Sequence, residues 1–455
     1  MHQHTRRRFP LRSLVAFAQF GAARFFFAPL GATLLSAALA GCTRSEVSLG
    51  SGQGPTDVGS ELICGDGTLA GTIVAGTQEQ LEALRGCTEV NVDLQLLGFP
   101  GMDLSPLSEL RIVRGNLSVG SALPRGSNAF SIPSLAGLEA LEQVNSLLLS
   151  QLTVPDLSAL AGLRSVRHDP LGPRAEGGAL EITDCDRLRN LGGLDALSGF
   201  TDLRTAENAL LESLSGLQVP PMLRSVDLSG ATLSDLSALA PLRNVENFVL
   251  SDTGVENLDA LQLVTANWLL LVNNDWLERA DSLSSLQTLP ILTVVNNDRL
   301  GELPALERTD GLEFFTVVGN AELRSIPSFP MSIAALVETG LYSQVRNSSE
   351  GLYGFTLFEV GDNPKLTQIA GMGAASSATE VAIYGNASLT AIDLGVLNSL
   401  STLRIVDNPA LDSIQLAQPA QVSQLQVRNN PLLSTAPFAG VQTLSRDIAG
   451  NLDAP

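Results

Sequence analysis

The chain has 455 residues and a formal net charge of −20, from 47 acidic and 27 basic side chains. Such an acidic surface repels nucleic acid and anionic lipid headgroups, which excludes binding to either through charge alone. Hydrophobic residues make up 44% of the chain but aromatic residues only 5%. The length therefore allows a large core, and that core is expected to be aliphatic.

The N-terminal segment, residues 1–41, is predicted to be an export signal, because it combines five arginines, no acidic residue and a long apolar stretch. It ends in Leu39-Ala40-Gly41-Cys42, which resembles the lipobox of bacterial lipoproteins. That resemblance implies cleavage before Cys42, lipidation of its thiol and anchoring in the cell envelope. Because Thr43 is not acidic, the same resemblance favours anchoring in the outer membrane. Residues 5–9 resemble a twin-arginine export motif, and an ordinary basic region explains them equally well.

After the signal, residues 42–60 are rich in Ser, Gly and Thr and are predicted to form a flexible tether. Residues 61–90 are expected to form an N-terminal cap. In it, Thr77 is a candidate N-cap for a short helix whose apolar residues follow at helical spacing. Cys64 and Cys87 bracket this segment, and an exported protein favours a disulfide between them.

Beyond the cap, asparagine recurs at steps of 22 or 23 residues, with leucine three residues after each. A period of this length is typical of solenoids. In the preceding turns the same position holds Cys185, Asn208, Ala231 and Thr253, and Cys185 is expected to be a buried small apolar residue. We call this series the asparagine ladder, and its asparagines from the middle of the chain onward are Asn274, Asn297, Asn320, Asn363, Asn386, Asn408 and Asn430.

One repeat shows what the period means. Leu292 and Val294 alternate with outward residues, as in a strand with one buried face. Asn297 follows where the chain must turn, and a buried amide there can satisfy backbone groups of the turn. The sequence thus predicts a repeat solenoid over residues 91–452, with parallel strands on one face and irregular or short helical return segments. Its last strand is expected around residues 447–449, followed by a short stub.

The period is interrupted in three places. The gap of 43 residues between Asn320 and Asn363 is interpreted as two steps with one degenerate repeat near residues 337–341. Residues 120–129 and 167–177 break the pattern and are expected to form surface loops, where solenoids sometimes carry binding residues.

Two resemblances accompany the period. The cap, with Cys64 and Cys87, and phrases such as Gly115-Asn-Leu117-Ser-Val119 resemble receptor L domains. The middle, notably Leu223-Arg-Ser-Val226-Asp-Leu228 and Leu233-Ser-Asp-Leu236-Ser-Ala-Leu239, resembles internalin-type leucine-rich repeats. Both imply a parallel β-solenoid. The cysteine-rich module of the receptors does not follow here, so receptor-like signalling is not implied.

Catalytic residues are scarce. Apart from His2 and His4 in the signal, the only histidine is His168, in a predicted loop. No spacing typical of metal or cofactor binding occurs, so we expect neither. Acidic residues and asparagines precede the ladder positions, and we interpret them as turn residues, with a cation-binding row as the alternative. These residues are Asp184, Glu207, Asp252, Asn273, Asn296, Asp362, Asp407 and Asn429.

The outward strand residues are the predicted functional surface. This row is polar at both ends and aliphatic in the middle, which suggests a contact with a protein. The sequence therefore predicts a non-catalytic envelope lipoprotein that binds a protein or glycan. A polysaccharide-active β-helix enzyme is the alternative. The candidate ligand-binding face comprises Val249, Leu270, Val272, Val295, Val318, Tyr384, Arg404 and Arg428.

Overall fold

The computed structural model describes part of the chain. The described residues are 46–47, 71–120, 132–167, 178–306, 309, 312–327, 354–372, 377–395, 397, 399–416 and 422–453. The predicted signal, the tether apart from the backbone of residues 46–47, Cys42, Cys64 and His168 lie outside them. The two predicted loops lie almost entirely outside them as well. Among the described residues no helix has the length and apolar character needed to cross a membrane.

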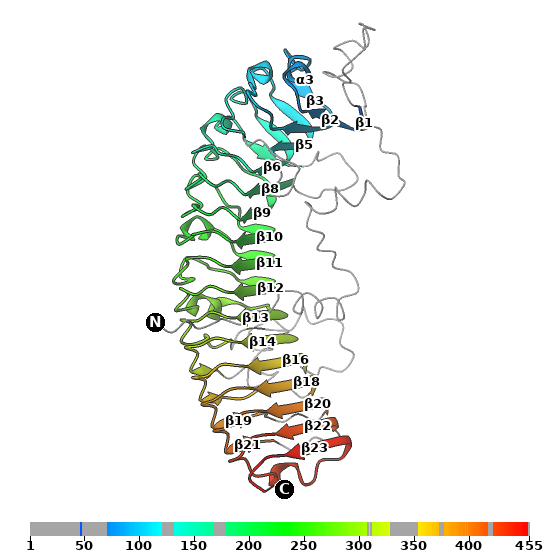
Figure 1. Ribbon diagram of the computed structural model, residues 1–455, viewed down its shortest axis with the longest axis vertical. Helices are drawn as coiled ribbons and strands as arrows, with labels where there is room; N and C mark the ends of the chain where they lie inside the picture. Colours follow the sequence, from blue (N-terminus) through cyan, green and yellow to red (C-terminus); the bar gives the residue numbers. More distant parts are fainter. Residues whose placement is uncertain are drawn as a thin grey trace. The chain divides into compact units, whose positions relative to one another are not determined.

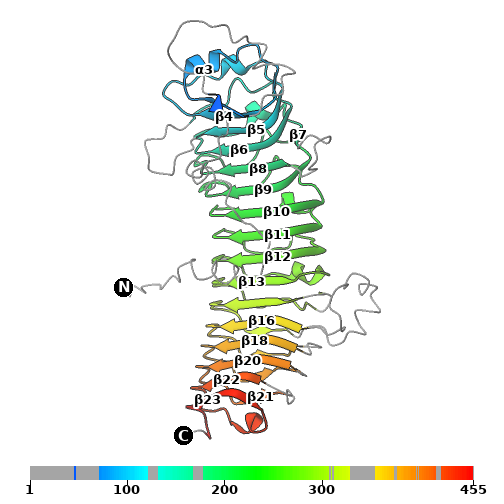
Figure 2. The same ribbon diagram turned by 90° about the vertical axis from the view of Figure 1, so that its right-hand side faces the viewer.

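A parallel sheet runs through the described chain, and each turn of the solenoid adds one strand beside the previous one (Figures 1 and 2). Its successive strands are β1 (Glu46–Val47), β2 (Thr72–Ala75), β4 (Asp93–Leu97), β5 (Ile112–Gly120), β6 (Gln143–Ser150), β8 (Gly178–Thr183), β9 (Phe200–Ala206), β10 (Met222–Ser229), β11 (Asn244–Ser251), β12 (Thr265–Val272), β13 (Ile291–Val295), β14 (Phe314–Val318), β16 (Gly354–Gly361), β18 (Ser377–Tyr384), β20 (Ser399–Val406), β22 (Val422–Arg428) and β23 (Thr443–Ala449). Two short strands, β3 (Glu89–Val90) and β7 (Ser165–Val166), pair with β5 and β6.

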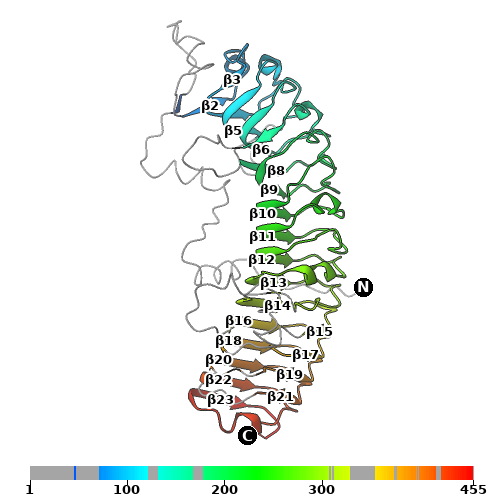
Figure 3. The same ribbon diagram turned by 180° about the vertical axis from the view of Figure 1, so that it is seen from behind.

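The return segments are short and mostly irregular, as predicted. They contain the 3-10 helices η3 (Ser105–Leu107), η4 (Ser158–Leu160), η5 (Ser237–Leu239), η6 (Asp281–Ser285) and η8 (Ala436–Phe438). A second, four-stranded parallel sheet consists of β15 (Ser325–Ile326), β17 (Gln368–Ile369), β19 (Ala391–Asp393) and β21 (Ser413–Gln415) (Figure 3). Aspartate starts several of the 3-10 turns. Asp235, for example, accepts a hydrogen bond from the backbone N–H of Ser237 at 2.8 Å.

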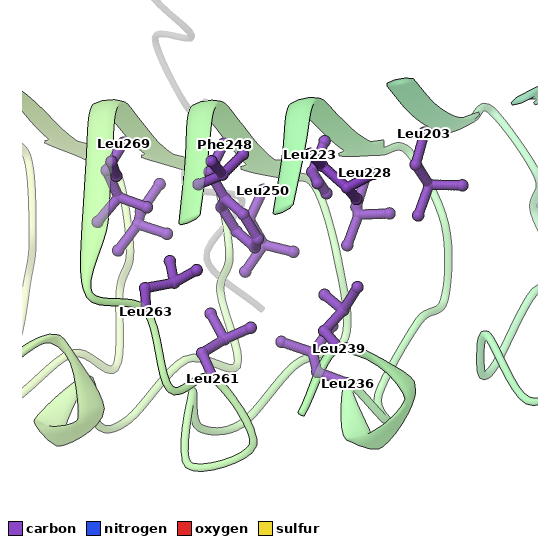
Figure 4. Packing of buried hydrophobic residues seen from close by; sticks show 14 of the residues in the cluster. Leu203, Leu223, Leu228, Leu236, Leu239, Phe248, Leu250, Leu261, Leu263 and Leu269 are labelled. Carbon is purple, nitrogen blue, oxygen red and sulfur yellow. The ribbon is translucent and has the colours of Figure 1, made fainter. Parts of the chain in front are cut away.

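The core lies between the main sheet and the return segments. Leucines of the strands, such as Leu228 and Leu269, meet leucines of the return segments, such as Leu239 and Leu261 (Figure 4). All four are at most 2% exposed. Burying such a side chain contributes about 1.5–3 kcal/mol, and the neighbouring turn supplies much of the cover. Each turn therefore depends on the next for its stability.

The cap helix forms where the sequence predicts it. Helix α3 (Gln78–Glu82) is preceded by Thr77, whose side-chain oxygen accepts a hydrogen bond from the backbone N–H of Gln80 at 3.3 Å. Leu81 and Leu84 point into the core and are fully buried. Cys87 follows and is 1% exposed. Because Cys64 lies outside the described residues, the disulfide between the two stays a prediction.

The interpretation of the 43-residue gap was wrong. Strand β14 pairs directly with β16, with Val318 opposite Gly361. The backbone N–H of Asn320 donates to Oδ1 of Asn363 at 3.0 Å. Two strands in direct register leave no room for a strand between them, so these turns adjoin and the extra residues are an insertion. Residues 337–341, the proposed degenerate repeat, lie outside the described chain.

Candidate functional site

The asparagine ladder lies in the interior, as predicted, and Asn297 shows how it works. Its Nδ2 donates to the carbonyl oxygens of Leu271 at 3.0 Å and Val295 at 3.2 Å. Its Oδ1 accepts from the backbone N–H of Asn274 at 3.1 Å. Each amide thereby joins its own turn to the one before it. The ladder asparagines from Asn208 to Asn430 are fully buried, which makes them structural residues.

The ladder also includes Cys185 and Thr253, and it ends one turn further on than the sequence suggested. The backbone N–H of Cys185 donates to Oδ1 of Asn208 at 2.9 Å, and the Thr253 hydroxyl donates to Oδ1 of Asn274 at 2.7 Å. At the far end Asn451 accepts from the backbone N–H of Asn430 at 3.2 Å. Asn451 was expected to belong to a stub. Its distance from Asn430, close to one period, was the signal that could have identified it as a ladder residue.

The residues just before the ladder positions are turn residues, which supports the first of the two interpretations. All of those named above have left-handed backbone, with φ between 51° and 58°, and glycines at the same position have φ between 65° and 73°. Asn, Asp and Gly adopt this conformation at least cost. Within the described residues no group of three or more His, Cys, Asp or Glu side chains is placed to hold a metal ion.

The aliphatic part of the outer face is less exposed than the sequence suggested. Val272 and Val295 are only 8% and 5% exposed, so they are not available for contact as expected. Val249, Leu270 and Val318 are partly exposed. Register explains part of the difference, because Val295 stands between Val272 and Val318 on the neighbouring strands. Side chains at that spacing shield one another.

A charged cluster lies on the outer face toward the N-terminal side of this aliphatic part. Glu181, Arg204 and Asp227 are in register on β8, β9 and β10. Arg204 lies 3.2 Å from the Asp227 carboxylate and 3.9 Å from that of Glu181. Burial raises the pKa of Glu181, and the nearby Arg204 opposes that effect. The arginine is thus neutralised by its two neighbours.

A second cluster lies on the C-terminal side, on β16, β18 and β20. The Tyr384 hydroxyl donates to Oε1 of Glu359 at 2.9 Å. The Arg404 guanidinium carbon lies 5.4 Å from the centre of the Tyr384 ring. Burial raises the pKa of Glu359, while the hydrogen bond from Tyr384 lowers it in part. The sequence placed Glu359, Tyr384 and Arg404 on this face, but it did not indicate the contacts among them.

Arg428, the last residue of the predicted face, is exposed and lies one strand further on. Its guanidinium is 3.4 Å from the carboxylate of Asp447, which also accepts a hydrogen bond from the Gln426 side chain at 3.2 Å. An exposed pair of this kind contributes little stability.

Trp276 is an exposed aromatic residue in the turn that follows β12. Its side chain is 50% exposed, and the Arg299 guanidinium lies over the ring at 4.1 Å from its centre. Both residues follow a ladder asparagine by two positions, in successive turns. Trp268, by contrast, belongs to β12 and is partly buried.

Cys185 is a buried thiol without catalytic surroundings. It is a free cysteine and is fully buried. Burial raises the pKa of this thiol to about 12, so the reactive thiolate is scarce near neutral pH. This agrees with its expected role as a small core residue.

No protein-family model matches the sequence, and no curated protein matches it. Among solved structures, an internalin from Listeria monocytogenes strain 4b F2365 is 14% identical, with 75% of this chain and 89% of the internalin covered and a TM-score of 0.35. A leucine-rich-repeat protein of Leptospira interrogans is 15% identical, with 83% of this chain and 94% of the Leptospira protein covered and a TM-score of 0.34. A TLR13–ssRNA13 complex is 14% identical, with 84% of this chain and 73% of the TLR13 chain covered and a TM-score of 0.23.

The protein is a parallel β-solenoid of the leucine-rich-repeat type. This assignment depends on the strand ladder and the buried asparagines described above, and the solved structures, with TM-scores of 0.35 or lower, add no argument to it.

Proposed function

We propose that this protein is a non-catalytic binding scaffold whose outer sheet face holds a protein or glycan partner. The observation that carries the proposal is the arrangement of that face. Partly exposed aliphatic residues at Val249, Leu270 and Val318 lie between two polar clusters on strands of one continuous sheet. An apolar centre with a polar rim is the usual anatomy of a protein contact.

The face can be tested with single charges. Leu270→Asp and Val249→Asp place a carboxylate in the aliphatic part of the face. Ala387→Asp adds the same charge at an exposed turn residue away from it. We expect the first two variants to lose partners that wild type captures from envelope extract, and the third to keep them. Equal capture by all three, with unchanged melting temperatures, would show that this face is not the binding surface. A glycan array probed with the same variants tests the glycan arm.

We further propose that the chain is anchored through Cys42 in the cell envelope, in the outer membrane. The support is the lipobox-like sequence before Cys42 and the absence of an acidic residue after it. Cys42→Ser should abolish incorporation of radiolabelled palmitate and release the protein into the soluble fraction. Labelling that persists in this variant would refute the anchor.

The Cys64–Cys87 disulfide belongs to the same proposal, because disulfides persist in the oxidising compartment to which an exported protein is sent. Closing a loop of this size contributes roughly 3 kcal/mol in the loop-entropy account. We expect Cys64→Ser to lower the free energy of unfolding by about 2–4 kcal/mol. Peptide mapping without reduction should find the two cysteines in one linked fragment, and separate fragments would exclude the pairing.

A further inference from the structure

We propose that Arg404, held against Tyr384, is a binding site for a carboxylate on an acidic and apolar segment of a protein partner. This inference depends on the proposed binding role of the outer face and names the chemistry that one end of it recognises. Four features of the structure lead to it: the position of the guanidinium, the support behind Tyr384, the charges around Arg404, and the neighbouring aliphatic residues.

The guanidinium is positioned without using its donors. Arg404 is exposed, and its guanidinium carbon lies 5.4 Å from the centre of the Tyr384 ring. Contact with the face of an aromatic ring restricts an arginine while leaving its in-plane N–H groups available. Those groups match the two oxygens of a carboxylate in a bidentate pair. Less side-chain freedom is therefore lost when the ligand binds.

Tyr384 is itself fixed from two sides. Its hydroxyl donates to Glu359 at 2.9 Å, and its ring covers Gly361, the residue beside it in register on β16. A Cβ at Gly361 would lie closer to this ring than van der Waals contact permits. The glycine thus provides the space in which the ring lies. Glycine, glutamate, tyrosine and arginine from three strands form one supported arrangement.

The charge of Arg404 is not balanced on the face. Its neighbours in register are Ala382 on β18 and Gln426 on β22, which are both neutral. Arg404 forms no ion pair with any other residue that the structure describes. Arg204, at the same outward position eight strands earlier in the sheet, lies between two carboxylates. The difference leaves Arg404 as the arginine that can attract an external anion.

The acidic residues around Arg404 do not form an ion pair with it. Glu380 lies on the adjacent strand, two residues from Ala382, and Asp447, two strands away beyond Gln426, is paired with Arg428. Glu359 is two strands from Arg404, with Ala382 between them in register. Burial raises the pKa of Glu359, which disfavours its charged form, and its carboxyl group is bonded to Tyr384. Glu359 therefore serves to hold the tyrosine, and its attraction for Arg404 is a minor effect.

The surroundings favour a protein over a polysaccharide. Val318 lies on β14, three strand spacings from Arg404 on β20, which is about 14 Å at 4.7–4.9 Å per spacing. Leu270 lies two strands further in the same direction. A ligand that follows the sheet would meet partly exposed aliphatic side chains and then a guanidinium. A segment with apolar residues and an acidic residue about ten positions away along a helix has this pattern, since ten residues rise about 15 Å.

The test selects peptides on the protein and asks which of its residues they need. A random 16-residue peptide library is displayed on phage and selected on the full chain. We expect the recovered peptides to combine apolar residues with a required Asp or Glu. Arg404→Gln should weaken these peptides about tenfold or more, as expected for a lost charged hydrogen-bond pair. Arg404→Lys should weaken them less, because charge is kept but the planar pair is lost. Arg324→Gln is the matched control, because Arg324 is an exposed arginine next to β15, which belongs to the second sheet. This variant should bind the peptides as tightly as wild type.

Paired changes separate recognition from general damage. Replacing the peptide's Asp or Glu by Asn or Gln should weaken its binding to the wild-type protein. The same replacement should cause no further loss of affinity for the Arg404→Gln variant, because that variant already lacks the carboxylate's partner. Gly361→Ala, which displaces the Tyr384 ring, should weaken acidic peptides and leave their amide versions unchanged. The inference is overturned if no acid-dependent peptide is recovered, or if the peptides bind Arg404→Gln as well as wild type.

Two further outcomes assign the result. If polygalacturonate binds in an Arg404-dependent manner while no acidic peptide is recovered, the site recognises a glycan and the inference is wrong. If Leu270→Asp abolishes peptide binding but Arg404→Gln does not, the outer face still binds proteins and only the recognition of a carboxylate fails. Failure of both variants to affect any selected peptide would also refute the proposed binding of a protein partner by this face.

Discussion

Replacing Asn297 by leucine tests whether the buried amides hold successive turns together. In the structure, Oδ1 of Asn297 is the acceptor for the backbone N–H of Asn274, at 3.1 Å. Nδ2 donates to Leu271 and Val295 in the turn core. The carbonyl of Val295 also accepts from the backbone N–H of Asn273 at 2.9 Å, so it keeps a partner in the variant. The backbone N–H of Asn274, by contrast, loses its partner in the variant, because the leucine side chain has no acceptor atom.

The magnitude follows from this difference. Leaving one buried backbone donor unsatisfied costs about 1–3 kcal/mol. Leucine has the same number and branching of side-chain heavy atoms as asparagine, so no cavity forms, and its bulkier methyl groups add to the loss in this fully buried position. We therefore expect Asn297→Leu to lower the free energy of unfolding by about 2 kcal/mol. Asn267→Leu, the same substitution at an exposed residue of β12, should change it by less than about 0.5 kcal/mol.

Urea unfolding followed by tryptophan fluorescence measures this effect locally. The two tryptophans of the chain, Trp268 and Trp276, lie in the turn before Asn297. Amide hydrogen exchange adds a direct readout, since the N–H of Asn274 should lose protection in the variant. Equal stability of Asn297→Leu and wild type, or unchanged protection at Asn274, would refute the role given to the ladder.

Three further outcomes are expected. In urea unfolding, Gly319→Ala should lower the free energy of unfolding more than Gly101→Ala. Both glycines have positive φ, but only a Cβ at Gly319 would meet the Asn296 side chain. Equal losses of stability in the two variants would contradict this. Burial raises the pKa of Glu359, so the folded state favours the protonated carboxyl, and the free energy of unfolding falls as pH rises from the ordinary glutamate range through the raised pKa. Glu359→Gln should flatten this part of the curve of stability against pH. An unchanged curve would show that burial of this carboxyl does not affect stability. Cys185, with its thiol pKa at about 12, should react with iodoacetamide only after unfolding, and labelling of the folded chain would show that the thiol is accessible.

Several parts of the structure could be predicted from the sequence because they repeat. A period of 22 or 23 residues with a fixed Asn and Leu identified the solenoid, the strand positions and the buried amides. Residues before the ladder positions, such as Asp252 and Asn273, were recognisable as turn residues from their type. The helix start at Thr77 was similarly local. In each case the physical cause lies within a few residues of the chain, or recurs in every turn.

Contacts between turns were harder to predict. The sequence alone did not show that Asn320 and Asn363 are partners, because spacing cannot distinguish an insertion from a degraded repeat. It also overstated the exposure of Val272 and Val295, since exposure depends on the side chains beside them in the sheet. Missing Asn451 was different, because its spacing carried the signal.

The sequence by itself determined a stack of turns joined through interior amides, because periodic burial and turn chemistry are written in each repeat. Only the tertiary structure decided that Tyr384 extends over Gly361 to Glu359 and that Arg404 forms no ion pair with any other residue that the structure describes. The physical reason is register. Residues about 20 to 25 positions apart become neighbours only when strands align, and alignment sets which charges are balanced and which remain available.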